Sequence, residues 1–140
     1  MQRNGSAVWK GGLKDGNGQV STGSGGLKGA PYTFASRFET GGKTDPEELV
    51  AAAHAACFSM AFSGQLGQAN LTPESIATTA TVTLEKTDAG MTVTAVHLKV
   101  KAKVPGADRA AFDKAANSAK AGCPISRLLN AKITMEAVLE

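Results

Sequence analysis

Two cysteines and two histidines are the residues of this chain that could do thiol or metal chemistry: Cys57, Cys123, His54 and His97. By count they match a Cys2His2 zinc set, but structural zinc sites usually contain close pairs of ligands, and Cys123 has no near partner. His97 alternates with lysines, a pattern that indicates a solvent-exposed strand face. His54 and Cys57 share one helical face, which fits a catalytic pair or, more often, core packing. We therefore expect no metal site and take the two thiols as the main candidates.

The two thiols have different local settings. Cys57 lies within an alanine-rich segment next to Phe58, so local rules predict a buried thiol with a raised pKa. Cys123 precedes Pro124, and as the N-cap of a short helix it would meet free backbone N–H groups, which lower a thiol pKa. Local reasoning therefore favours Cys123 as the activated thiol. Cys57 becomes reactive only if a cation such as Arg37 is brought against it.

The helix that carries Cys57 has a strong start signal. Asp45 is its predicted N-cap, Pro46 takes the first helical position, and Glu48 can complete a capping box. We predict that this helix runs to about residue 65. It is apolar on every side over residues 49–62, so it must be covered on all sides, and one small sheet covers only one.

Strands and short helices are predicted on both sides of this helix. Strands are expected over residues 6–10, 19–22 and 32–39, a long hairpin over 76–86 and 91–104, helices over 107–121 and 124–130, and a closing strand over 133–139. Alternation in the strand over 32–39 would place Arg37 on the face opposite to the aromatic side chains. The pattern predicts an α+β fold in a single domain, residues 1–140.

Composition and charge argue against several classes of partner. The net charge is only +3, and one Trp and one Tyr offer little base stacking, so we expect no nucleic-acid partner. The longest apolar stretch, residues 50–62, falls short of the roughly 20 residues that span a bilayer, so we expect no membrane helix. The N-terminus lacks the pattern of a secretory signal, and the expected location is the cytoplasm.

Three motifs resemble the OsmC/Ohr family of thiol-dependent peroxidases, with OsmC itself as the closer branch. They are Asp-Pro-Glu-Glu-Leu at 45–49, Ala-Ala-His-Ala-Ala-Cys-Phe-Ser-Met at 52–60 and Lys-Ala-Gly-Cys-Pro-Ile-Ser at 120–126. The resemblance extends over essentially the whole chain. It implies an OsmC-like fold, in which an antiparallel sheet is wrapped with a long buried central helix in an intertwined homodimer.

The resemblance also implies roles for four residues of a hydroperoxide reductase. Cys57 would be the peroxidatic thiolate and Cys123 the resolving thiol. Arg37 would be the activating cation, and Glu47 the carboxylate that holds this arginine. Glu47 suits that role on local grounds too, because Glu48 already has a structural task in the predicted capping box.

Organic hydroperoxides are the substrates that the resemblance implies, with hydrogen peroxide reduced less well. The expected pocket is lined by Phe58, Met60 and Phe62 or their neighbours. By resemblance a lipoyl-type or other small dithiol resets the enzyme, and no metal, haem, flavin or other cofactor is required. The alternative is a non-catalytic dimeric stress or binding protein whose cysteines are core residues.

Helix geometry raises a question about Glu47. It lies ten residues before Cys57, which is roughly 15 Å of rise on a straight α-helix and too far for one arginine to touch both side chains. Either the helix breaks or the glutamate comes from another chain. Because the apolar helix also demands cover, we favour an obligate homodimer in which Glu47 of one chain lies beside Arg37 and Cys57 of the other.

Overall fold

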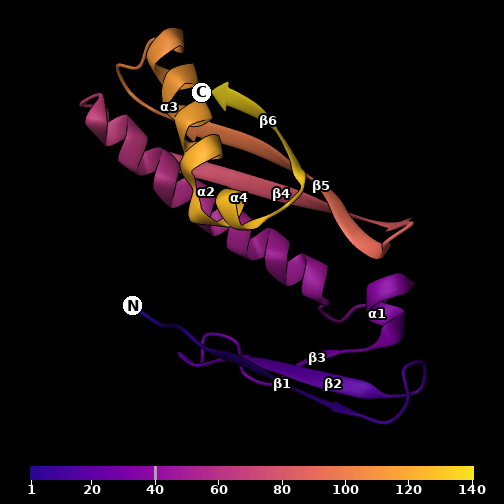
Figure 1. The fold of residues 1–140 in the computed structure, drawn as a ribbon. Helices are drawn as coiled ribbons and strands as arrows, with labels where there is room; N and C mark the ends of the chain where they lie inside the picture. The colour runs from indigo at the N-terminus through magenta and orange to yellow at the C-terminus, as the bar shows by residue number, and fades with distance from the viewer. Residues whose placement is uncertain (40) are drawn as a thin grey trace. The chain divides into compact units, whose positions relative to one another are not determined.

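The computed structural model describes residues 1–39 and 41–140, which form two sheets and a set of helices (Figure 1). The elements in chain order are β1 (Gly5–Lys10), β2 (Asn17–Thr22), β3 (Ala30–Tyr32), α1 (Phe34–Phe38), α2 (Pro46–Gln68), β4 (Ser75–Thr87), β5 (Gly90–Lys103), α3 (Arg109–Gly122), α4 (Pro124–Leu128) and β6 (Lys132–Leu139). Two sheets with separate helices confirm the predicted α+β class. The chain divides into two compact units, Met1–Leu49 and Val50–Glu140, and each is described by itself.

The N-terminal unit contains a three-stranded antiparallel sheet in the order β1-β2-β3. The rings of Trp9 on β1 and Tyr32 on β3 pack with their centroids 5.4 Å apart. Between them, on β2, lies Gly18, where a Cβ atom would come within 2.5 Å of the Tyr32 ring. Glycine at this position therefore allows the two rings to approach across the central strand.

The predicted strand over residues 32–39 is wrong, because β3 ends at Tyr32 and the short helix α1 follows. A capping box starts this helix: the Ser36 backbone N–H donates to Thr33 Oγ1 at 3.1 Å, and the Thr33 backbone N–H donates to Ser36 Oγ at 2.9 Å. Two reciprocal local bonds outweigh the alternating pattern. Arg37 consequently does not point away from the aromatic rings, and its guanidinium lies 5.1 Å from the centroid of Phe38.

The C-terminal unit contains a second sheet in the order β4-β5-β6. β4 and β5 form the predicted long antiparallel hairpin, but β6 pairs in parallel with β5, so the expectation of a wholly antiparallel sheet is wrong for this strand. The chain crosses over through α3 and α4 before β6, and such a crossover lets a strand return in the same direction. The inner face of β5 shares a core with α2 and α3 (Figure 1).

Helix α2 begins as the sequence predicts and ends slightly later. The Glu48 backbone N–H donates to Asp45 Oδ1 at 2.7 Å, which confirms the N-cap. The Glu48 carboxylate accepts a hydrogen bond from Thr44 Oγ1 at 2.7 Å and not from the Asp45 backbone N–H, so the predicted capping box is only half formed. The helix is continuous from Pro46 to Gln68, three residues beyond the predicted end, so it does not break between Glu47 and Cys57.

One stripe of α2 is buried within the chain, formed by His54, Phe58, Phe62 and Leu66. The regular spacing of four presents this stripe to the core of the C-terminal unit. By length and composition alone the helix passes the test for a membrane span, with a mean hydropathy of 1.3 over an 18-residue window. A core helix passes the same test, and the packed stripe identifies α2 as one. The opposite side remains open, with Met60 78% exposed.

Candidate active site

The two cysteines lie in contact in the C-terminal unit. Cys57 comes from α2, and Cys123 lies at the junction where α3 ends and α4 begins. The Cys123 thiol donates to Cys57 Sγ at a distance of 2.8 Å, and both residues are free thiols. Cys123 is fully buried, whereas Cys57 is half-buried. The two sulfur atoms are therefore in contact, and Cys57 is the more accessible of the two.

The backbone around Cys123 directs its thiol inward. The Cys123 N–H donates to Ala119 O at 2.9 Å at the end of α3, and Pro124 then starts α4. As the N-cap of α4, the Cys123 side chain makes no capping hydrogen bond, so the local argument for its activation gains no support. The N–H of Ile125, one of the first in α4, donates toward Cys57 Sγ instead.

Burial raises the pKa of the Cys57 thiol, as the sequence predicts. The hydrogen bond from the Ile125 N–H acts in the opposite direction and lowers this pKa, without offsetting the effect of burial. Within one unit of one chain, Cys57 is thus held mainly as a neutral thiol. Its conversion to a reactive thiolate requires a positive charge from elsewhere.

Neither histidine contacts a cysteine sulfur, so the arrangement does not form a catalytic Cys–His pair. His54 is fully buried, with Nε2 hydrogen-bonded to Ser126 Oγ at 2.8 Å, and burial lowers its pKa. His97 lies on the outer face of β5, with Nδ1 2.7 Å from Thr134 Oγ1. Across the described ranges, 1–39 and 41–140, no group of three or more His, Cys, Asp or Glu side chains could hold a metal ion.

Arg37 and Glu47 form an ion pair in the N-terminal unit. Arg37 Nε donates to Glu47 Oε2 at 3.0 Å, and Arg37 Nη2 donates to Glu47 Oε1 at 2.7 Å. Arg37 lies in the last turn of α1 and Glu47 in the first turn of α2. The hydrogen bond to Glu47 raises the pKa of Arg37. The bidentate geometry fixes the guanidinium plane. The glutamate holds the arginine of its own chain, so the expectation that Glu47 would pair with the partner's arginine is wrong.

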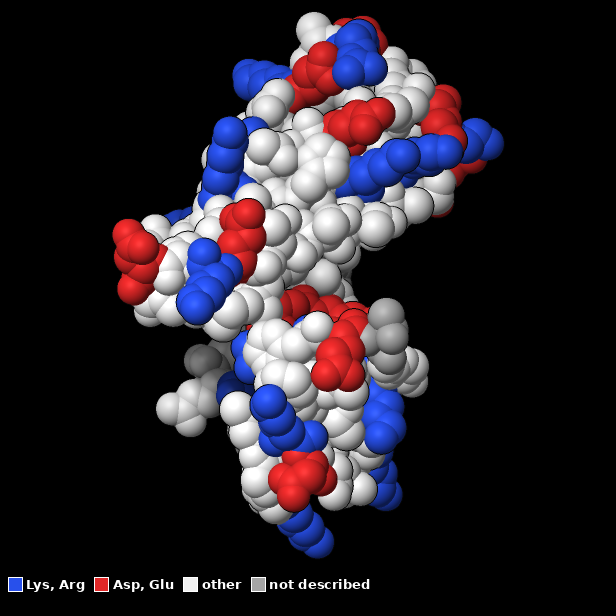
Figure 2. All heavy atoms as spheres, turned by 90° about the vertical axis from the view of Figure 1, so that its right-hand side faces the viewer, with Lys and Arg blue, Asp and Glu red and all other residues white. Residues whose placement is uncertain are grey.

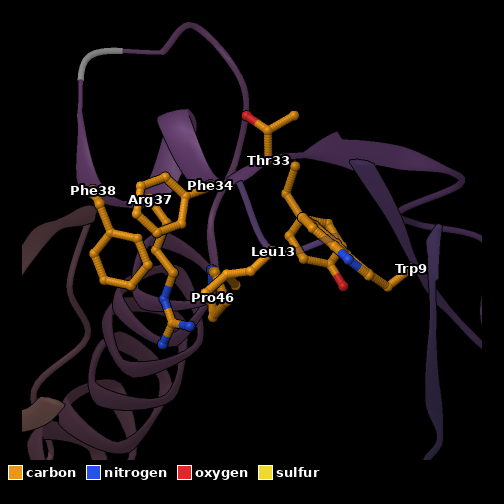
Figure 3. A pocket seen from close by; sticks show the side chains of 8 residues that line it. Trp9, Leu13, Thr33, Phe34, Arg37, Phe38 and Pro46 are labelled. Carbon is orange, nitrogen blue, oxygen red and sulfur yellow. The ribbon is translucent and has the colours of Figure 1, made fainter. Parts of the chain in front are cut away.

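An apolar cavity of about 250 Å³ lies against Arg37 in the N-terminal unit (Figure 3). Figure 3 shows the Arg37 side chain beside the Phe38 ring, with Pro46 close by. The remaining lining residues come from β1, the β1–β2 turn and the segment that joins β3 to α1: Trp9, Leu13, Tyr32, Thr33 and Phe34. Sequence reasoning did not assign these residues to a pocket, although Trp9 and Tyr32 are the chain's single Trp and single Tyr.

Two of the three predicted pocket residues on α2 belong to the core instead. Phe58 and Phe62 are fully buried and pack on each other, with their ring centroids 5.7 Å apart. Phe62 also packs edge-on against Phe112 of α3, at 5.3 Å. Both rings are part of the core of the C-terminal unit. Met60 faces away from this core and is exposed.

Charged side chains of both signs are interspersed on the face that Figure 2 shows. On this face neither sign gathers into one continuous patch. This face therefore presents a mixed surface and not a basic one.

These features define an α+β protein with a pair of free thiols in contact. A family model described as OsmC-like protein matches residues 39–138. The chain is 51% identical over 140 residues, covering all of this chain and 98% of the relative, to the protein named Peroxiredoxin OsmC in Escherichia coli (strain K12), and equally to its counterpart in Shigella flexneri. The chain belongs to the OsmC-like family, which confirms the resemblance of its three motifs.

Solved structures of the same family show the same fold. An OsmC-like protein of unknown function from Vibrio cholerae has a TM-score of 0.79 at 17% identity, over 99% of each chain. An organic hydroperoxide resistance protein from Elizabethkingia anophelis has a TM-score of 0.77 at 21% identity, over 100% of this chain and 99% of that one. At these identities the likeness establishes the architecture.

Proposed function

We propose that this thiol-dependent peroxidase reduces organic hydroperoxides with Cys57 as the peroxidatic residue and Cys123 as the resolving residue. The observation that carries the proposal is the 2.8 Å contact between two free thiols on different elements. The assignment of roles follows accessibility, because Cys57 is half-buried and Cys123 is fully buried. The names of relatives support it, since they include Peroxiredoxin OsmC and organic hydroperoxide resistance proteins.

The proposed reaction has two steps on the protein. The Cys57 thiolate attacks the terminal oxygen of the hydroperoxide, the O–O bond breaks, and the alkoxide takes a proton and leaves as an alcohol. Cys57 is then a sulfenic acid. The Cys123 thiol attacks its sulfur, the S–O bond breaks, and the hydroxide leaves as water with the thiol proton. A small dithiol of the lipoyl type, in the cytoplasm, then reduces the disulfide.

The Arg37–Glu47 pair supplies the positive charge that Cys57 needs in this proposal. The bonds to Glu47 use the Nε N–H and one N–H of Nη2, so both N–H groups of Nη1 and the second one of Nη2 are left to donate to a thiolate or a peroxide oxygen. A bidentate carboxylate also prevents the guanidinium from turning away. An opposite charge within about 4–6 Å lowers a thiol pKa and offsets the effect of burial.

The cavity beside Arg37 is the proposed site for the organic part of the substrate. Its aromatic and aliphatic lining favours an alkyl or aryl group over water, which agrees with a preference for organic hydroperoxides over hydrogen peroxide. The guanidinium at its edge would hold the peroxide end of the molecule. We accordingly treat residues 1–140 as one functional domain.

An intertwined homodimer is the proposed assembly. The open side of α2 carries Met60, which is 78% exposed, together with alanines such as Ala52 and Ala56, and this apolar surface needs cover in water. A second copy of α2 packed antiparallel would provide it. The ion pair of one chain could then serve Cys57 of its own chain or of its partner.

Thiol counting tests the assignment most directly. One equivalent of a tert-alkyl hydroperoxide should consume both thiols of the reduced protein together and release one equivalent of alcohol. If both cysteines stay reduced, the alternative of a non-catalytic protein with core cysteines replaces the proposal.

Subunit complementation tests the shared site. Inactive Glu47→Ala and Cys57→Ser proteins are refolded together and assayed. Sites built from two chains regenerate one intact site in each heterodimer, whereas sites built within one chain regenerate none. Sedimentation that shows an active monomer at assay concentration would contradict the dimer itself.

A further inference from the structure

A second contact joins the same two elements as the thiol pair. His54 Nε2 and Ser126 Oγ lie 2.8 Å apart, the same separation as the two sulfur atoms. His54 precedes Cys57 by three residues on α2, and Ser126 follows Cys123 by three residues in α4. The two contacts therefore lie about one helical turn apart along the line where α2 meets the α3–α4 junction.

Burial of the His54 ring costs free energy, which indicates a functional reason for a histidine at this position. His54 is fully buried, and across residues 1–39 and 41–140 its Nδ1 has no hydrogen-bond partner. A leucine or phenylalanine at this position would fill space without burying a polar ring atom. Because an unpaired buried N–H costs more than an unpaired ring nitrogen, the proton belongs on Nε2, which donates to Ser126 Oγ.

The two contacts differ in what oxidation does to them. The thiol–thiol hydrogen bond ends when Cys57 becomes a sulfenic acid, because the sulfur then carries an oxygen. The His54–Ser126 bond involves neither sulfur, so oxidation of a cysteine removes neither its donor nor its acceptor. Helix α4 has only five residues, so it depends on such contacts to stay in place against α2.

We infer that His54 and Ser126 are positioning residues for disulfide formation: their hydrogen bond holds α4, and with it Cys123, against α2 while Cys57 is a sulfenic acid. The inference rests on the proposed roles of the two cysteines. When the bond is intact, the Cys123 sulfur attacks the Cys57 sulfur and water leaves. When it is broken, a second hydroperoxide reaches the sulfenic acid, transfers one oxygen to form a sulfinic acid, and leaves as an alcohol.

The variant Ser126→Ala tests this inference through the ratio of sulfinic acid to disulfide, which a loss of stability alone would not change. Stopped-flow mixing with a tert-alkyl hydroperoxide gives the rate of alcohol release and the later rate of disulfide formation. Mass spectrometry then gives the ratio of sulfinic acid to disulfide at Cys57. We expect an unchanged first step, a roughly fivefold slower second step, the size of one lost hydrogen bond, and a matching rise in sulfinic acid.

Two further variants serve as matched controls. Ser59→Ala removes a different hydroxyl, which lies on α2 and donates to Thr78 Oγ1 on β4, also at 2.8 Å. This variant should leave the ratio of sulfinic acid to disulfide as in the wild type. Ser126→Thr keeps a hydroxyl on the same backbone position and should restore fast resolution. His54→Phe should reproduce Ser126→Ala, and the double variant should be no slower than either single one.

The results separate the inference from the function on which it rests. If Ser126→Ala gives the wild-type ratio, or if Ser59→Ala raises the sulfinic acid as much, the positioning role is overturned and the peroxidase proposal stands. If the wild-type protein forms no disulfide with the hydroperoxide, the proposed cysteine roles are overturned instead. An unchanged first step in Ser126→Ala shows that the variant is folded.

Discussion

The two units of the chain differ in how deeply their side chains are buried. The C-terminal unit has a core of fully buried side chains, and Cys123 is part of it. Among the described residues of the N-terminal unit, no large side chain is fully buried, and rings such as those of Trp9 and Phe38 are more than a third exposed. Its Arg37 side chain is 37% exposed.

This difference matches what each unit would contribute to the chemistry. A disulfide forms only if two sulfur atoms meet within narrow limits of distance and angle, so its residues belong on rigid, packed elements. A guanidinium acts through its charge over several ångströms and tolerates a looser setting. The comparison shows that both thiols lie within one packed unit, whereas the Arg37 side chain is partly exposed at the surface of the other.

Substitution of the cysteines should have the largest effect. Cys57→Ser should reduce peroxide turnover to the background rate, because the attacking sulfur is lost. Cys123→Ser should still release one equivalent of alcohol and then stop, with a sulfenic acid at Cys57 that over-oxidises to a sulfinic acid. Alcohol release and mass spectrometry measure both outcomes. A sulfenic acid at Cys123 in the Cys57→Ser protein would reverse the assignment.

Removal of a large aromatic ring should lower the free energy of unfolding more in the C-terminal unit than in the N-terminal unit. Phe62→Ala removes a fully buried ring from the C-terminal core and should lower the free energy of unfolding by about 3–5 kcal/mol. Trp9→Ala removes a ring that is 37% exposed and should cost much less than that. Urea denaturation of both variants measures the difference. Equal losses would show that the N-terminal unit has a core of its own in solution.

Loss of the arginine charge should affect reactivity without dismantling the thiol pair. Arg37→Ala should raise the pKa of Cys57, because in the proposed site the thiolate loses the cation that offsets its burial. Alkylation at neutral pH should slow by about tenfold or more, because a smaller share of Cys57 is then thiolate. The rate of alkylation against pH measures this shift. A profile like that of the wild type would remove Arg37 from the mechanism.

Removal of the α1 cap should have the smallest effect. Thr33→Ala deletes the side chain that accepts the Ser36 N–H and should destabilise the helix that carries Arg37 by about 1 kcal/mol. Hydrogen exchange over residues 34–38 should quicken while exchange in α2 stays unchanged. Thr33→Ser keeps the hydroxyl and serves as the control. Faster exchange over residues 50–68 of α2 as well would contradict a local effect of this cap.

Local signals in the sequence predicted a large part of this fold. The start of α2, the β4–β5 hairpin and the buried face of α3 all follow from caps, turns and spacing, because these depend on neighbouring residues. Helix α1 was missed, since alternation of aromatic residues hid the capping box of Thr33 and Ser36. The parallel pairing of β6 was missed because its partner strand lies far away in the sequence.

The site was predictable to a different extent. The family resemblance paired Cys57 with Cys123 and Arg37 with Glu47, and hydrogen bonds join each pair in the structure. The local helix-cap argument pointed to Cys123 as the acceptor of α4 N–H groups, whereas the Ile125 N–H donates toward Cys57. The pocket was misplaced because α2 is apolar all round. Its sequence alone does not tell which side faces the core, and the structure places Phe58 and Phe62 there.

The separation of the two cysteines along the chain also has a thermodynamic consequence. They are 66 residues apart, so an oxidised pair would close a loop that contains β4, β5 and α3. Such a cross-link restricts the unfolded chain and stabilises the fold by about 4 kcal/mol in the chain-entropy description. By reciprocity the fold lowers the reduction potential of the disulfide by about 90 mV. Each turnover would thus alternate between an oxidised protein that is more stable to unfolding and a reduced protein that is less stable. Reduction of the disulfide would then require a strongly reducing dithiol.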